Sequence, residues 1–147
     1  MSTVTYEQDF FSWTVEQAAL LKQRRFDLLD IAHLVEELEE MGQSEKRALV
    51  SFIEVLLMHL LKWQYEPSHR STSWELSIVE HRDRIIDHLA DNPGLKGRLG
   101  EHFTQGYKYA RLGAARETGL PLKTFPTECP WTYEQVIQDG FLPSQEA

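Results

Sequence analysis

Hydrophobic residues recur along most of the chain at the three- and four-residue spacing of a helix face. This pattern predicts helices over residues 5–24, 27–41, 44–65, about 71–90 and 95–117, with a short helix begun by Pro130. Gly42, Pro67, Pro93 and Gly119 mark the predicted ends. No segment alternates apolar and polar residues as a strand would. We therefore predict an all-α fold, an antiparallel helical bundle of about five helices with a proline-rich C-terminal tail packed over it.

The helix predicted over residues 44–65 is apolar nearly all round, which is typical of a helix at the centre of a bundle. On a helical wheel His59 shares a face with Leu56 and should point inward, whereas Lys62 falls on another face, the solvent or groove side. We expect Leu56 and Leu60 to be buried. The helix over residues 27–41 has its apolar face on Leu28, Ile31, Val35 and Leu38. The short connection from residue 41 to 44 predicts that these two helices are antiparallel neighbours.

Length and composition fit one domain over residues 1–147, with 41% hydrophobic and 26% charged residues. The single cysteine, Cys129, excludes a disulfide within the chain. Together with an N-terminus that lacks the pattern of a secretory leader, it favours a cytoplasmic protein. The longest apolar stretch is interrupted by Glu54, His59 and Lys62, so we expect no membrane span.

Charge is unevenly distributed along the chain. The formal net charge of −8 disfavours broad nucleic-acid binding, although it leaves room for a local basic groove. Residues 26–45 hold seven acidic residues and no lysine or arginine, whereas residues 96–123 hold six basic residues and two acidic ones. Such runs are commonly solvated helix faces with ion pairs between helices.

A cluster of polar and aromatic residues is expected where the central helix ends. The loop over residues 66–72 reverses the chain, so the start of the next helix returns near His59. Cations beside aromatic rings suit an anion or a planar ligand. The candidate ligand-binding residues are His59, Lys62, Trp63, Arg70, Trp74 and Arg82. The alternative is a core histidine beside stacked tryptophan and arginine side chains, without a ligand.

The spacing of the histidine and acidic residues gives little support for a metal site, and the surroundings of the cysteine give little support for a nucleophile. The only Glu-x-x-His, from Glu66 to His69, contains a proline, and His81 and His88 lie two helical turns apart. Glu128 would raise the thiol pKa of Cys129, which disfavours a nucleophile. We expect no metal site and no cofactor, and the sequence leaves open whether the protein is an enzyme. The alternative function is a metal-assisted hydrolase that uses His59 and acidic residues of the second helix.

Several segments together resemble the family called domain of unknown function 29. They are YEQDFFSWTVEQAALLKQRRFDLLD, VEELEEMG, LLMHLLKWQYEP with RSTSW, ARETGLP and FPTECPWTYEQV. The resemblance implies a small bacterial α-helical protein of unestablished activity. Its recurrent polar positions would fall on Glu36, Glu37, Glu39, His59, Lys62, Trp63, Arg70, Ser73, Trp74 and Arg82. The matching tail residues are Arg116 to Gly119 and Pro126 to Trp131.

The sequence therefore predicts a binding or interaction module with a polar and aromatic site at the end of its central helix. The expected partner is an anionic ligand or a protein, with no membrane and with nucleic acid disfavoured by the net charge. The sequence specifies neither the ligand nor the oligomeric state.

Overall fold

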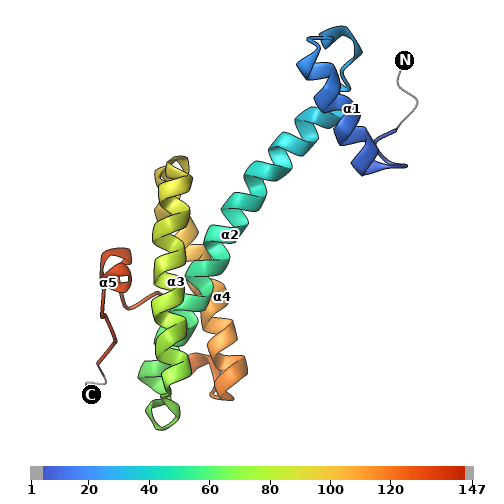
Figure 1. The fold of residues 1–147 in the computed structure, drawn as a ribbon. Helices are drawn as coiled ribbons and strands as arrows, with labels where there is room; N and C mark the ends of the chain where they lie inside the picture. The colour runs from blue at the N-terminus through green and yellow to red at the C-terminus, as the bar shows by residue number, and fades with distance from the viewer. Residues whose placement is uncertain (1–4, 145–147) are drawn as a thin grey trace. The chain divides into compact units, whose positions relative to one another are not determined.

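The computed structural model describes residues 5–144, and their fold is all-α, as predicted (Figure 1). No strand is present among these residues. The helices are α1 (Phe10–Lys22), α2 (Ile31–Tyr65), α3 (Thr72–Asp91), α4 (Leu99–Thr118) and α5 (Tyr133–Ile137). Short 3-10 turns connect them at Phe26–Leu28, Pro67–His69, Pro93–Arg98 and Leu122–Thr124. Over the same residues, no helix is both long enough and apolar enough to cross a membrane.

The described residues form two compact units that meet in the sequence between Gln43 and Ser44. The N-terminal unit contains α1, the turn Phe26–Leu28 and the first part of α2. The C-terminal unit contains the rest of α2 and all of α3, α4 and α5. The single domain expected over residues 1–147 stays a prediction, and the two units are described separately below.

Helix α2 is one continuous helix of 35 residues where the sequence predicted two. Within residues 5–144, the glycines with positive φ are Gly119 and Gly140, so Gly42 keeps helical backbone angles. Glycine costs about 1 kcal/mol relative to alanine inside a helix, which weakens the helix without ending it. The expected loop after Met41 is therefore wrong, and so is the antiparallel pairing of helices 27–41 and 44–65.

The other helix ends follow local capping. Ser71 caps α3, since its hydroxyl accepts a hydrogen bond from the Trp74 backbone N at 3.2 Å. Gly119 ends α4 with φ of 77°, the left-handed conformation expected of it. The last helix begins later than predicted, because Thr132 and Gln135 form a capping box after Pro130.

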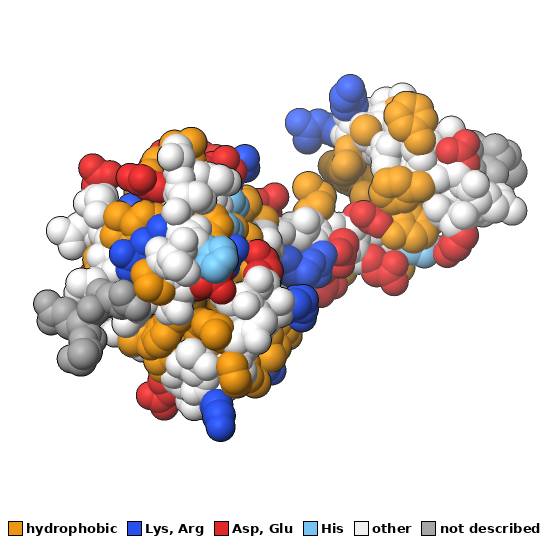
Figure 2. Space-filling view, turned by 90° about the horizontal axis from the view of Figure 1, so that it is seen from below, with side chains coloured by type: hydrophobic (Ala, Val, Ile, Leu, Met, Phe, Trp, Pro, Cys, Tyr) orange, Lys and Arg blue, Asp and Glu red, His pale blue; other side chains and the backbone are white. Residues whose placement is uncertain are grey.

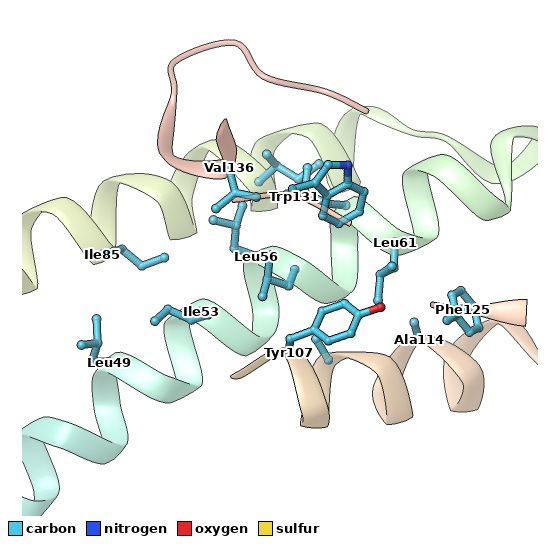
Figure 3. Close-up of a cluster of buried hydrophobic side chains, with 14 of the residues drawn as sticks. Leu49, Ile53, Leu56, Leu61, Ile85, Tyr107, Ala114, Phe125, Trp131 and Val136 are labelled. Carbon is cyan, nitrogen blue, oxygen red and sulfur yellow. The ribbon is translucent and has the colours of Figure 1, made fainter. Parts of the chain in front are cut away.

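The core of the C-terminal unit lies where α2, α3, α4 and the C-terminal segment meet (Figure 3). Leu56 and Leu60 of α2 are fully buried, which confirms their predicted place. Phe125 and Trp131, from the segment after α4, are buried in the same cluster. Helix α4 approaches α2 closely at Gly106, where an added Cβ would lie 2.6 Å from Ile53 Cγ2.

The continuity of α2 gives a direct prediction for Gly42. We expect Gly42→Ala to raise the free energy of unfolding by up to about 1 kcal/mol, because nothing lies within 4 Å of the added Cβ and alanine favours a helix. Chemical denaturation with circular dichroism measures the change. Gly119→Ala is the control, and it should be destabilising because L side chains rarely adopt its positive φ. A loss of stability in Gly42→Ala like that of the control would restore the predicted helix end.

Candidate functional site

Lys62, which the helical wheel assigned to the solvent or groove side, is buried in the C-terminal unit. Its side chain reaches across the C-terminal unit, where Nζ lies 2.8 Å from Glu117 Oε1 and 4.5 Å from the centroid of the Trp74 ring. Only 6% of Lys62 is exposed. The wheel placed Lys62 on another face than Leu56 and His59, and the structure covers that face with the Trp74 ring of α3 and the Glu117 carboxylate of α4. The ammonium charge is thus already paired within the fold.

Arg70 and Trp63 form a second pair. The Arg70 Nε donates a hydrogen bond of 2.7 Å to the Trp63 backbone oxygen, and its guanidinium carbon lies 5.0 Å from the Trp63 ring centroid. The bond satisfies one of the carbonyls that the end of α2 leaves without a helical partner. Arg70 is exposed, so its remaining donors face solvent.

His59 is half-buried and is oriented by its own helix. Its Nδ1 lies 2.9 Å from the Val55 backbone oxygen, so this nitrogen carries the proton and donates. Burial lowers the pKa of His59 below its ordinary value. The neutral imidazole therefore adds no positive charge to an anion site at neutral pH.

Arg82 holds the C-terminal segment against α3. Its Nε donates to the Val136 backbone oxygen at 2.9 Å, and its Nη2 donates to that of Phe141 at 2.8 Å. The structure thus pairs Lys62 with Trp74 and Arg70 with Trp63. His59 and Arg82 instead bond to backbone oxygens. The role of these residues in binding a ligand stays a prediction.

The hydrolase alternative gains no supporting observation. Among residues 5–144, no group of three or more histidine, cysteine, aspartate or glutamate side chains could hold a metal ion. Glu36, Glu37 and Glu39 belong to the same helix as His59, but they precede it by twenty residues or more.

The N-terminal unit contains a cluster that the sequence did not predict. Trp13 Nε1 donates to Asp30 Oδ2 at 2.9 Å, and the same carboxylate oxygen lies 2.7 Å from His33 Nδ1. Tyr6 stacks on the His33 ring with centroids 4.1 Å apart, and its hydroxyl donates to Glu37. Asp30 directly precedes α2, and His33 and Glu37 follow it at the i+3 and i+7 positions. Helical spacing therefore puts the three residues on one side, and this spacing was the available signal.

Charge pairing organises this cluster. The hydrogen bond to Asp30 raises the pKa of His33 above its ordinary value, and the same bond lowers the pKa of Asp30. The hydrogen bond to Glu37 raises the pKa of Tyr6 to about 12. The packing of the first helix region on α2 therefore uses the polar side of α2.

The apolar side of the same part of α2 is exposed. Ile31, Val35 and Leu38, which we call the apolar stripe, follow one another at i, i+4 and i+7 and so share a helix face. Their exposed fractions are 58%, 48% and 66%. The sequence predicted this apolar face correctly. It also predicted that the helix over residues 44–65 would pack against it, which is wrong because both segments belong to one continuous helix. Figure 2 shows hydrophobic side chains on the surface of the N-terminal unit with acidic ones beside them.

Helix α1 adds further exposed apolar surface to this unit. Phe11 is 75% exposed and Val15 is 54% exposed, one turn apart on α1. Residues 5–43 carry only three basic residues, Lys22, Arg24 and Arg25. Their nine acidic residues are Glu7, Asp9, Glu16, Asp27, Asp30, Glu36, Glu37, Glu39 and Glu40. The unit is therefore both acidic and unusually apolar on its surface.

The family model described as Domain of unknown function DUF29 matches residues 5–142, nearly the whole chain. No curated protein matches the chain. No solved structure matches it either.

Proposed function

The chain belongs to the family of the Domain of unknown function DUF29, whose description states no activity, and we propose that it is a protein-interaction module. The observation that carries this proposal is the apolar stripe of α2. Three large aliphatic side chains on one helix face, each about half exposed or more, are typical of a surface that pairs with another helix.

The partner that best fits the stripe is a protein helix with its own apolar stripe and basic flanks. Glu36 and Glu39 are exposed beside the stripe, and the unit has a threefold excess of acidic over basic residues. Two copies paired through this face would bring like charges together, which costs affinity. A helix with lysine or arginine on its flanks would gain both the apolar contact and charge complementarity.

Two synthetic helical peptides test this proposal. Both carry the same leucine stripe, and one has lysine flanks where the other has glutamate flanks. We expect the full chain to bind the lysine peptide at least about tenfold more tightly, a difference of about 1.4 kcal/mol, and the difference to shrink with salt. Fluorescence anisotropy of labelled peptides measures both affinities.

The control variants separate apolar contact from charge. Leu38→Glu adds a negative charge, so charge attraction alone would strengthen binding of the lysine peptide. The same substitution removes one apolar side chain of the stripe, so a loss of apolar contact would weaken binding. Leu76→Glu is the matched control, because Leu76 lies on α3 and is 61% exposed. The proposal requires weaker binding in Leu38→Glu and unchanged binding in Leu76→Glu.

Two results would overturn the proposal. Equal binding of the lysine peptide to Leu38→Glu and to the wild type would remove the role of the stripe. Sedimentation of the wild type as a dimer that Leu38→Glu dissociates would identify a second copy as the partner in place of a basic helix.

A further inference from the structure

A pocket of about 610 Å³ opens in the C-terminal unit between α4 and the segment that follows Pro126. Its size falls in the range of small-molecule sites, about 300–1,000 Å³. The lining combines aromatic and basic side chains, chiefly Phe103, Tyr107, Lys108, Arg111, Cys129 and Trp131. None of these residues belongs to the N-terminal unit, so the pocket is independent of the apolar stripe.

The inner walls of the pocket are apolar and have few free polar atoms. The Tyr107 hydroxyl donates to the Pro126 backbone oxygen at 2.5 Å, so the tyrosine contributes its ring. Burial raises the pKa of Cys129 to about 11, so its thiol stays neutral. The sequence predicted the direction of this shift but attributed it to Glu128. Three aromatic rings beside a neutral thiol suit a flat apolar body.

Positive charge lies at the same pocket. Arg111 is half-buried, and its Nε donates to the Phe125 backbone oxygen at 3.0 Å, which fixes the guanidinium while leaving its terminal nitrogens for another acceptor. Lys108 is exposed and also lines the pocket. Glu128 is the acidic residue of the lining, so the two cations leave one net positive charge. One net positive charge matches a ligand with a single negative charge.

We infer that this pocket binds an aromatic carboxylate, with the aromatic body between Tyr107 and Trp131 and the carboxylate on Arg111 and Lys108. A planar guanidinium pairs with a carboxylate through two parallel hydrogen bonds, which gives Arg111 the leading part. The basic excess noted over residues 96–123 was the sequence signal for this site, although it did not locate a pocket.

Alkylation of Cys129 by the neutral reagent iodoacetamide tests the inference on the full chain, because the cysteine is unique and lines the pocket. Only the thiolate reacts, so the rates are measured at about pH 9, where a small fraction of this thiol is ionised. The probes are 1-naphthoate and its neutral amide, 1-naphthamide. At about ten times its dissociation constant, naphthoate should slow alkylation about tenfold, since the free fraction falls by that factor. Naphthamide at the same concentration should protect much less. Mass spectrometry measures the rates.

Variants assign the charge. Lys108→Gln combined with Arg111→Gln should abolish protection by naphthoate, whereas Arg111→Lys should keep part of it. The matched control Lys123→Gln removes a cation outside the pocket and should leave protection unchanged. Circular dichroism and the alkylation rate without probe check that each variant folds.

Equal protection by naphthoate and naphthamide would show that charge plays no part. Protection that survives the double variant, or no protection of the wild type at all, would also overturn the inference. Lys108→Gln alone keeps the test valid if the double variant does not fold, because Lys108 is exposed. Its removal should weaken naphthoate protection and leave naphthamide unaffected.

Discussion

Leu56→Ala is expected to lower the free energy of unfolding by about 2–5 kcal/mol. Leu56 is fully buried in the core of the C-terminal unit, among side chains of α2, α3 and α4. The loss combines the transfer free energy of the removed carbons with the cavity that the rigid neighbours leave open. Urea denaturation followed by circular dichroism measures it, because a large part of the chain is helical.

Leu38→Ala is the matched control for this measurement. It makes the same chemical change on the same helix, but Leu38 is 66% exposed, so we expect a change within about 0.5 kcal/mol. A loss below about 1 kcal/mol for Leu56→Ala, or equal losses for both variants, would contradict the central place of this part of α2.

Helix faces could be predicted from the sequence because they depend on local spacing. The periodicity identified Leu56 and Leu60 as core residues and placed the apolar face around Val35, and both are found in α2. The face that Leu56 was predicted to share with His59 is only half-buried, because the core lies on the side of Ile53, Leu57 and Leu61. The helix end at Gly119 was also predicted correctly from the glycine and the Pro121 that follows it. In the structure Gly119 adopts the left-handed conformation and ends α4. The all-α class follows from the same periodic signal.

The continuity of α2 could not be predicted from local signals, because the competing terms are small. Gly42 and Ser44 form a plausible stop and start, yet each costs a continuous helix only about 1 kcal/mol or less. Strong helix formers on both sides of Gly42, such as Glu39, Glu40, Lys46 and Arg47, offset such small terms. The error moved Val35 and Leu38 from a predicted interior to an exposed surface, and that surface carries the proposed function.

The environment of the candidate site residues depends on contacts between residues far apart in the sequence. Glu117, the carboxylate that pairs with Lys62, lies 55 residues further along the chain. The resemblance implied recurrent polar residues at both positions, but no local pattern shows that they meet. The Arg111 pocket was missed for the same reason. Its second wall is the segment from Thr127 to Trp131, which is not helical, so no periodic pattern indicates that it packs against α4.

Arg82 illustrates how one residue type can indicate either a ligand site or a structural contact. Its side chain is 4% exposed, and its two hydrogen bonds go to the backbone oxygens of Val136 and Phe141. Hydrogen bonds from a charged donor contribute about 1.5–3 kcal/mol each to the free energy of unfolding. A buried carbonyl oxygen that is left without a donor lowers the stability of the fold. These bonds tie the last described helix and its successor segment to α3.

Arg82→Met should therefore lower the free energy of unfolding by about 2–4 kcal/mol, because methionine keeps much of the packing but removes both donors. Arg84→Met is the matched control on the same helix, where an exposed arginine pairs with Glu80 at 2.9 Å. Exposed ion pairs of this kind contribute about 0.2–1 kcal/mol, so the control should lose little. Chemical denaturation compares the two, and limited proteolysis should cut the segment after Thr132 faster in Arg82→Met alone. If Arg82→Met is as stable as Arg84→Met, the guanidinium is not needed for the fold and its predicted role in binding a ligand gains weight.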